Sequence, residues 1–490
     1  MNGIKNVAII GAGPCGLAAA KYLVAEKVFN VQLFEQKPSV GGVWAYNSLT
    51  NLDEDFSIPR TKPTEKPDTP ITTADSQSPL FVSPVYDSLE TNIPHILMNF
   101  TDQPFPVKAS LFPGHSVVRQ YLEDYADEIR PLIKLSSQIL SATKKNERGE
   151  NGNGWEVKVL DLDTNSTTTT HFDAIVVASG HYNDPFVPSI RGLEAFNKEY
   201  PTAISHSKFY KSPSSFKGKI CEVSQQPVIV SERSTVTVES TNKALAYKPE
   251  IAEFIPEGRK VRFSDGVVES YVDHIVFCTG YFYSFPFLQG LSPPVVTDGA
   301  SALNLYQHCV YAPDPSLVFL GIPQRIVPFP VAEGQSAYVA RLWAGRLGLP
   351  TEAELKVWEL HMEQSRQEGQ AGNIHSLKFP KDRNYINMLY DLSMTAEKRA
   401  ELANDGVGKI PPYWDEEKAW IRARFPLIKV ASRALGEERH KIRELKQLGF
   451  DYEAEKEKEK VQTKLEDING SANPPGHNEI SAPPSVVVQS

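Results

Sequence analysis

The chain has 490 residues, enough for about three domains of average size. Apolar residues make up 41% and charged residues 23%, as in ordinary globular proteins. The net charge of −9 argues against a nucleic-acid partner, because proteins that bind phosphate backbones usually carry a basic surface. No apolar run approaches the length of about eighteen residues that a membrane span needs, so we expect no transmembrane segment.

The cysteines are few and scattered, and no two form a CxxC pair. This number is too small for a disulfide framework, so we expect a reducing, cytoplasmic environment. The first apolar run leads into glycines instead of a cleavage site, so we expect no signal peptide. No group of His, Cys and Asp has the spacing of metal ligands, so we expect no metal site. The cysteines are Cys15, Cys221, Cys278 and Cys309.

The first predicted elements form a βαβ unit. A strand is expected over residues 6–10, followed by the turn GAGPCG, a helix over 17–27 and a second strand over 31–35. Strand, glycine turn, helix and strand within about 30 residues are typical of a parallel sheet.

Residues 53–79 interrupt this pattern. The stretch is rich in Pro, Thr and charged residues and has almost no large apolar side chain, which predicts a long surface loop. Two interpretations of this loop remain: it borders a substrate entrance, or it is a tolerated surface insertion.

The remainder of the chain alternates between predicted strands and helices. Two buried strands, over 172–180 and 273–281, bound a candidate inserted domain. Beyond about residue 451 charge, Pro, Ser and Asn dominate, which predicts a disordered tail. Helices are expected over 117–130, 351–366 and within 415–449, and a further strand over 155–162.

The glycine turn indicates a dinucleotide site. Gly11 allows the tight turn, Gly13 lets the backbone approach a pyrophosphate, and Gly16 lets the helix pack on the strand. The helix N-terminus adds unpaired N–H groups and the positive end of the helix dipole. Glu35, 22 residues after Gly13, is placed to accept hydrogen bonds from ribose hydroxyls. Because a carboxylate would repel a 2′-phosphate, the site is predicted to hold FAD or NAD and not NADP.

Glu35 also begins the motif E-x5-G-G-x-W, which ends in Gly41, Gly42 and Trp44. With further segments in the same order, this motif resembles the flavin-containing monooxygenase family, in which the GGxW segment lies against FAD. The resemblance spans about residues 5–350 and is greatest to the shorter, soluble, fungal or yeast-like members. The further segments are YDSLETNIPHILMNF (86–100), ASGHYNDPFVPSIRGL (178–193), HSKFY (206–210), CTGY (278–281) and the PFPVAEGQS region (315–350).

The resemblance implies an α/β flavoprotein fold with two dinucleotide-binding domains. A discontinuous, Rossmann-like FAD domain comprises 1–180 and 278–450, and a smaller NADP-type domain, 181–277, is inserted between them; 451–490 is the tail. The implied reaction uses FAD, NADPH and O2. A 4a-hydroperoxyflavin transfers one oxygen atom to the nitrogen or sulfur of a small nucleophilic substrate. A Baeyer–Villiger monooxygenase on the same scaffold is an alternative function. A homodimer is one possible oligomeric state.

The expected second glycine turn, for NADPH, is missing. The family pattern has a strand, a GxGxSG turn and a helix after the FxGK segment, which is FKGK at 216–219 here. Only the seven residues 220–226, without glycine, precede the next strand at Pro227, whereas a parallel crossover needs about a dozen. The inserted domain is therefore predicted to be truncated near 220–227. Three interpretations are open: a skipped exon in the reading frame, a natural variant with impaired NADPH use (an uncoupled oxidase or an inactive protein), or a dinucleotide site rebuilt from other residues.

The resemblance also implies roles for single residues. Asn92 is the predicted catalytic residue beside the flavin, because an amide donates and accepts hydrogen bonds without titrating; the alternative is a turn hydrogen bond. Gln335 is a candidate FAD contact. Arg233 and His206 are candidates for NADP, although Arg233 is equally compatible with a solvated surface position. His181 and His308 are expected to be structural.

Overall fold

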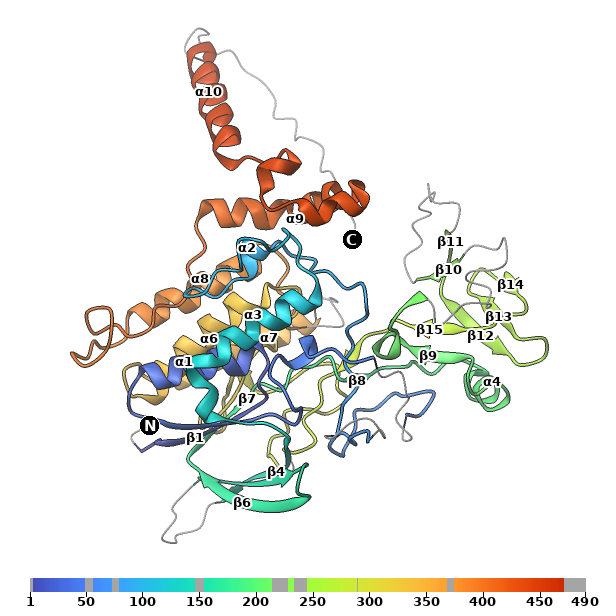
Figure 1. Cartoon of the computed structure of the whole chain (residues 1–490), viewed down its shortest axis with the longest axis horizontal. Helices are drawn as coiled ribbons and strands as arrows, with labels where there is room; N and C mark the ends of the chain where they lie inside the picture. The colour runs from blue at the N-terminus through green and yellow to red at the C-terminus, as the bar shows by residue number, and fades with distance from the viewer. Residues whose placement is uncertain are drawn as a thin grey trace.

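The structure is a computed structural model that describes residues 3–48, 56–72, 79–145, 154–213, 228–232, 245–288, 290–367 and 374–470. Figure 1 shows a body of helices and sheets, an inserted domain at one side that holds β9 to β15, and helix α10 pointing away from the body. The missing NADPH turn, residues 220–227, and Arg233 lie outside the described residues.

The body is built on a seven-stranded sheet in the order β17-β18-β19-β7-β1-β2-β3. Within it, β1 (Asn6–Ile10) pairs in parallel with β2 (Asn30–Phe34) on one side and with the central strand β7 (Ala174–Val177) on the other. β19 (Leu317–Phe319) adds to β7 in parallel, so the sheet joins strands from both ends of the chain. The remaining strands are β3 (Ile133–Lys134), β17 (Leu305–Tyr306) and β18 (Val310–Tyr311).

The two faces of the sheet bury different cores. Along β1, Val7 and Ile9 join the core under the helices, whereas Ala8 and Ile10 join the core under a second sheet. This alternation explains why the strand reads as a continuous apolar run, since both faces are covered. The covering helices are α1 (Pro14–Ala25), α3 (His115–Ala126) and α6 (Pro328–Trp343), and the second sheet is β4 (Ser137–Lys145), β5 (Gly154–Asp161) and β6 (Ser166–Phe172).

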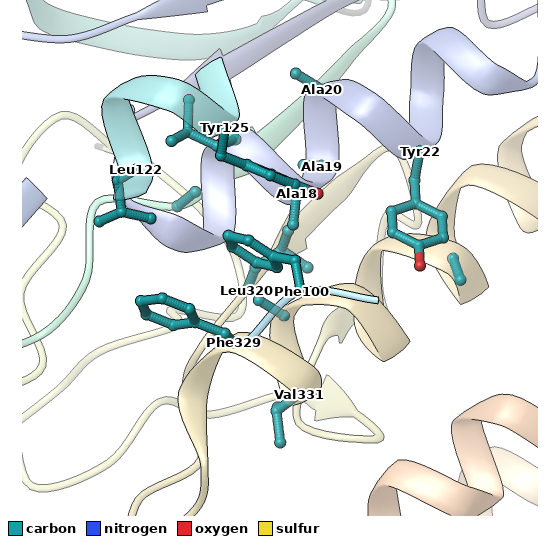
Figure 2. Packing of buried hydrophobic residues seen from close by; sticks show 14 of the residues in the cluster. Ala18, Ala19, Ala20, Tyr22, Phe100, Leu122, Tyr125, Leu320, Phe329 and Val331 are labelled. Carbon is teal, nitrogen blue, oxygen red and sulfur yellow. The ribbon is translucent and has the colours of Figure 1, made fainter. Parts of the chain in front are cut away.

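Aromatic side chains fill the helical side of the core. The ring of Phe100 stacks on Tyr125 at a centroid distance of 3.9 Å and on Phe329 at 5.0 Å. Figure 2 shows these rings between α1, α3 and α6, with Ala18 and Ala19 allowing the close approach of α1. Further helices are α2 (His95–Met98), α7 (Glu352–Gln367), α8 (Lys381–Met394), α9 (Glu416–Ala434) and the 3-10 helices Gly42–Trp44, Asp127–Leu132, Gly436–Lys441 and Leu445–Leu448.

The inserted domain begins and ends in two paired linkers. β8 (Asp184–Pro185) pairs antiparallel with β16 (Tyr281–Phe282), so the chain enters and leaves the domain side by side. Its core includes Phe196, Phe254 and Phe263. Its elements are α4 (Leu193–Glu199), β9 (Ile204–His206), the 3-10 helix Ser207–Phe209, β10 (Val228–Ser231), β11 (Leu245–Lys248), β12 (Ile251–Ile255), β13 (Lys260–Phe263), β14 (Val268–Glu269) and β15 (Ile275–Phe277).

The predicted disordered tail differs from the structure in its first part. Residues Tyr452–Gly470 form helix α10, whose start packs on α9 through the rings of Trp420 and Tyr452, 5.7 Å apart. Ion pairs of Arg424 with Glu455 and of Lys456 with Glu416 join the same two helices. The highly charged sequence is thus compatible with a helix because opposite charges pair within it and with α9. Residues 471–490 lie outside the described part.

Candidate functional site

The candidate site is a cavity of about 470 Å³ at the carboxyl edge of the sheet. β1, β2 and β7 run in parallel and end together there, followed by Gly11, Glu35 and Ala178, all of which line the cavity. Residues of both linkers and of the segment 56–72 complete the wall. Crevices outside the carboxyl ends of parallel strands are the usual ligand sites of open α/β sheets.

The glycine turn forms the floor of this cavity. Gly11 has φ +104°, and a Cβ atom there would lie 2.6 Å from the Ala178 carbonyl oxygen, so the turn requires glycine. Gly13 is the N-cap of α1, lines the cavity and contributes no side-chain cap. Gly16 does not line the cavity; its Cβ would lie 1.8 Å from the Gly11 carbonyl oxygen. The first turn of α1 contains no acidic residue, so its N–H groups and dipole are available to an anion.

Glu35 is held beside this turn. Its carboxylate accepts hydrogen bonds from the N–H of Ala12 at 2.8 Å and of Lys37 at 3.0 Å. Burial raises the pKa of the Glu35 carboxyl, opposed by the nearby Lys37 ammonium and by these N–H groups. Two N–H bonds fix the carboxylate and leave further lone pairs for a ligand's hydroxyl groups, as predicted for a ribose contact.

The GGxW segment and Asn92 lie at the same cavity. Gly42 and Trp44 line it, and the Lys37 ammonium donates a 2.8 Å hydrogen bond to the Gly42 carbonyl. Gly41 does not line the cavity; it has φ +113°, and its N–H donates a 2.9 Å hydrogen bond to the Ala12 carbonyl. Asn92 lines the cavity with an exposed side chain, so its amide is available to a ligand.

Like Gly16 and Gly41, the predicted residues Gln335 and His206 do not line the cavity. The Gln335 amide is fully buried: it accepts a 2.9 Å hydrogen bond from the Gly321 N–H and donates one of 2.9 Å to the Tyr385 hydroxyl. Since Gly321 lines the cavity, Gln335 positions the wall from behind. His206 is also fully buried; its Nδ1 accepts a 3.1 Å bond from the Lys208 N–H, and burial lowers its pKa to about 4.

A polar cluster in the wall was not predicted. The Asp68 carboxylate accepts hydrogen bonds from the side chains of Asn183 at 2.6 Å and Gln36 at 3.3 Å, and its backbone carbonyl accepts one of 2.7 Å from Gln138. All four residues line the cavity. Only Gln36 had a sequence signal, its place next to Glu35; nothing in 53–79 distinguished Asp68 from the residues of a surface loop.

The donor set fits a flavin dinucleotide. A Cβ atom on Gly13 would meet the Gly42 Cα at 3.5 Å, an ordinary van der Waals contact, so packing within the protein does not require glycine here. A pyrophosphate bound close to the backbone at the helix N-terminus would require it. Glu35 beside it offers acceptors but no cation, which suits an unphosphorylated ribose. The cavity volume lies within the range of cofactor clefts.

Family models match most of the chain. The model described as flavin-binding monooxygenase-like matches residues 81–225 and 221–404. The chain belongs to this family. A second model, for an NAD(P)-binding Rossmann-like domain, matches residues 9–61, which include the glycine turn. The predicted family and the two-domain flavoprotein fold are therefore confirmed.

Several proteins similar to this chain are named as flavin-containing or thiol-specific monooxygenases. The chain is 33% identical over 394 residues to flavin-containing monooxygenase FMO GS-OX-like 7 of Arabidopsis thaliana, covering 74% of this chain and 78% of the relative. It is 30% identical over 385 residues to the thiol-specific monooxygenase of Saccharomyces cerevisiae, covering 72% and 80%. Among solved structures, S-allyl-L-cysteine S-oxygenase from Allium sativum is similar with a TM-score of 0.68 and 26% identity, covering 89% of this chain and 94% of that one.

As a member of this family, the chain is an enzyme, a flavin-dependent monooxygenase. Membership implies a flavin, NADPH, O2 and a small-molecule substrate. Across the part of the chain that the structure describes, no helix combines the length and the apolar character needed to cross a bilayer.

Proposed function

We propose that this flavin monooxygenase binds FAD in the cavity and uses NADPH and O2 to oxygenate a soft nucleophile, with sulfur favoured over nitrogen. The observation that carries the proposal is the convergence of Gly13, Glu35, Trp44 and Asn92 on one cavity. The preference for sulfur rests on relatives named as a thiol-specific monooxygenase and as an S-oxygenase.

Each group has a separate task in this proposal. The N-terminus of α1 binds the pyrophosphate, and Glu35 accepts hydrogen bonds from the ribose next to it. The bound flavin supplies the chemistry of O2 activation. Trp44 lines the flavin end and excludes water, while the neutral amide of Asn92 orients the ligand without donating or taking a proton at working pH.

A second candidate function is an FAD protein with impaired NADPH use. One observation favours it: the family match breaks into two segments that meet at 221–225, where the sequence lacks the second glycine turn. In that case we expect slow consumption of NADPH, with O2 reduced to hydrogen peroxide in place of substrate oxygenation.

One assay separates the two functions. The FAD-loaded protein is supplied with NADPH, ¹⁸O2 and an alkyl thioether, whose sulfoxide keeps the transferred oxygen atom, and products are measured by mass spectrometry together with peroxide. The first proposal expects one ¹⁸O atom in the sulfur product and peroxide near background. Peroxide equal to the O2 consumed, with no sulfur product, supports the second function and contradicts the first.

A further inference from the structure

The segment 56–72, which we call the strap, is fastened beside the cavity by a buried carboxylate. The Arg60 guanidinium donates to one oxygen of Asp184 from Nε at 3.0 Å and from Nη2 at 2.8 Å. The Thr64 N–H donates to the other oxygen at 2.6 Å. The Asp184 side chain is only 4% exposed, so these partners are needed to offset its loss of hydration.

The far end of the strap forms part of the cavity wall. Thr64, Pro67 and Asp68 line the cavity. The hydrogen bonds of Asp68 to Asn183, Gln36 and Gln138 hold this end against the FAD domain and the first linker. In Figure 1 the strap is the blue segment near β8, between the body and the inserted domain.

The position of Glu35 identifies which half of the cofactor lies at the strap. Gln36, which bonds Asp68, directly follows Glu35, and the Lys37 ammonium interacts with the carboxylates of both Glu35 and Asp68. In our proposed function Glu35 binds the ribose of the adenosine. The strap therefore lies at the adenosine half of FAD.

The near end of the strap belongs to the inserted domain. Phe56 and Ile58 pack against that domain's core, and the Phe56 ring lies 5.2 Å from the ring of Phe209. Arg60 forms a β-bridge with Val187, with both N–H to carbonyl bonds at 2.9 Å. The strap thus connects the inserted domain to the cofactor cavity.

We propose that the strap closes over the adenosine half of FAD and retains the cofactor, with the Arg60–Asp184 ion pair as its anchor. The proposal rests on the proposed function for the presence of FAD. Arg60 acts as a positioning residue: it holds Thr64 to Asp68 in the wall through Asp184. Closure of a loop over a bound ligand slows ligand release and excludes water.

The test compares Arg60→Met with Lys62→Met, a control at an exposed lysine of the same strap. Dissociation constants are measured for FAD and for ADP, which carries only the adenosine half, and for riboflavin, which carries only the flavin half. Arg60→Met is expected to weaken FAD and ADP binding about tenfold, as loss of one charge-assisted anchor predicts, and to leave riboflavin binding unchanged. Lys62→Met is expected to behave as wild type. Equal affinities of Arg60→Met and wild type for ADP would overturn the proposal.

A second measurement uses the unaltered protein, in case Arg60→Met does not fold. Hydrogen exchange of the amides of residues 61–68 is followed with and without ADP, and ADP is expected to slow it. If ADP binds and these amides exchange as fast as before, the proposed closure of the strap is contradicted. Failure of the wild-type protein to bind FAD or ADP at all would instead contradict the proposed function.

Discussion

At the residue scale, two glycines of the same turn have different tasks: Gly13 is assigned to ligand binding and Gly16 to the packing of the fold. A Cβ at Gly13 has no neighbour closer than 3.5 Å, and its backbone is extended, whereas a Cβ at Gly16 would lie 1.8 Å from a carbonyl oxygen. We expect Gly13→Ala to melt like wild type without FAD but to bind FAD at least about tenfold more weakly. Gly16→Ala is expected to lower the melting temperature of the FAD-free protein. Thermal melts and FAD titrations of both variants check this, and a Gly13→Ala protein with normal FAD affinity would contradict the pyrophosphate site.

Asn92 carries the second prediction at this scale. Its side chain is exposed at the cavity, so Asn92→Ala removes a neutral hydrogen-bonding group with little effect on packing. We expect FAD affinity to stay within about threefold of wild type, while oxygenated product per NADPH falls about tenfold or more and peroxide rises. Product and peroxide yields are the measurement. Unchanged yields would assign Asn92 to the structural role of a turn residue.

Some residues of the cavity wall could be predicted from the sequence and others could not, for physical reasons. The βαβ pattern placed Gly11, Gly13 and Glu35 after the ends of β1 and β2, and the family motifs pointed to Gly42, Trp44 and Asn92; all six line the cavity. Gln335 sits on α6, and spacing in the sequence does not reveal which side of a fully buried helix meets the cavity. Asp68 reaches the wall only through tertiary contacts of an irregular segment, so no periodic pattern marks it.

At the element scale, the packing of α6 on α1 contains a buried acid. Glu333 accepts hydrogen bonds from the Thr101 N–H at 2.9 Å and hydroxyl at 2.6 Å and from the Tyr22 hydroxyl at 3.2 Å. Burial raises its pKa to about 7, against the opposing effects of Thr101 and Lys409. The folded protein therefore binds a proton more tightly than the unfolded chain, and this contribution to stability is lost as pH rises from about 4.5 through 7.

Glu333→Gln tests this pH dependence, because the amide stays neutral at every pH. We expect its melting temperature to match wild type near pH 5 and to exceed it at pH 8, where the charged carboxylate costs about 3 kcal/mol. The exposed Glu417→Gln on α9 is the control and is expected to show no such trend. A constant difference between Glu333→Gln and wild type across this range would show that the buried acid stays charged.

Secondary elements were predictable where apolar periodicity was strong. β1 matches its predicted range, where both faces are covered, and α7 lies within one residue of its own. α1 begins three residues before its predicted start and ends two residues before its predicted end. The predicted helical region 415–449 divides into α9 and two 3-10 helices. Helix α10 was not predicted, because its stabilising contacts with α9 are charge and ring pairs and not an apolar stripe.

At the scale of the whole molecule, the order of motifs predicted one discontinuous domain with an insertion, and the sheet has this form. Strands β1, β2 and β7 precede the inserted domain and β17, β18 and β19 follow it. The chain enters and leaves the insertion through the paired linkers β8 and β16. The sequence did not predict that the strap also connects the inserted domain to the body, because the contact between Arg60 and Asp184 joins residues far apart in the chain.

The proposal on which the others depend is that this cavity binds FAD and that the bound flavin oxygenates sulfur with electrons from NADPH. The most direct measurement is an anaerobic titration of the FAD-loaded protein with NADPH, followed by mixing with O2 and an alkyl thioether. We expect bleaching of one bound flavin per chain and then one sulfoxide formed per flavin reduced. Gly13→Ala, at an FAD concentration that just saturates the wild type, is expected to show both signals weakened because less of it holds FAD. A flavin that NADPH leaves oxidised, or that reoxidises with only peroxide formed, would contradict it.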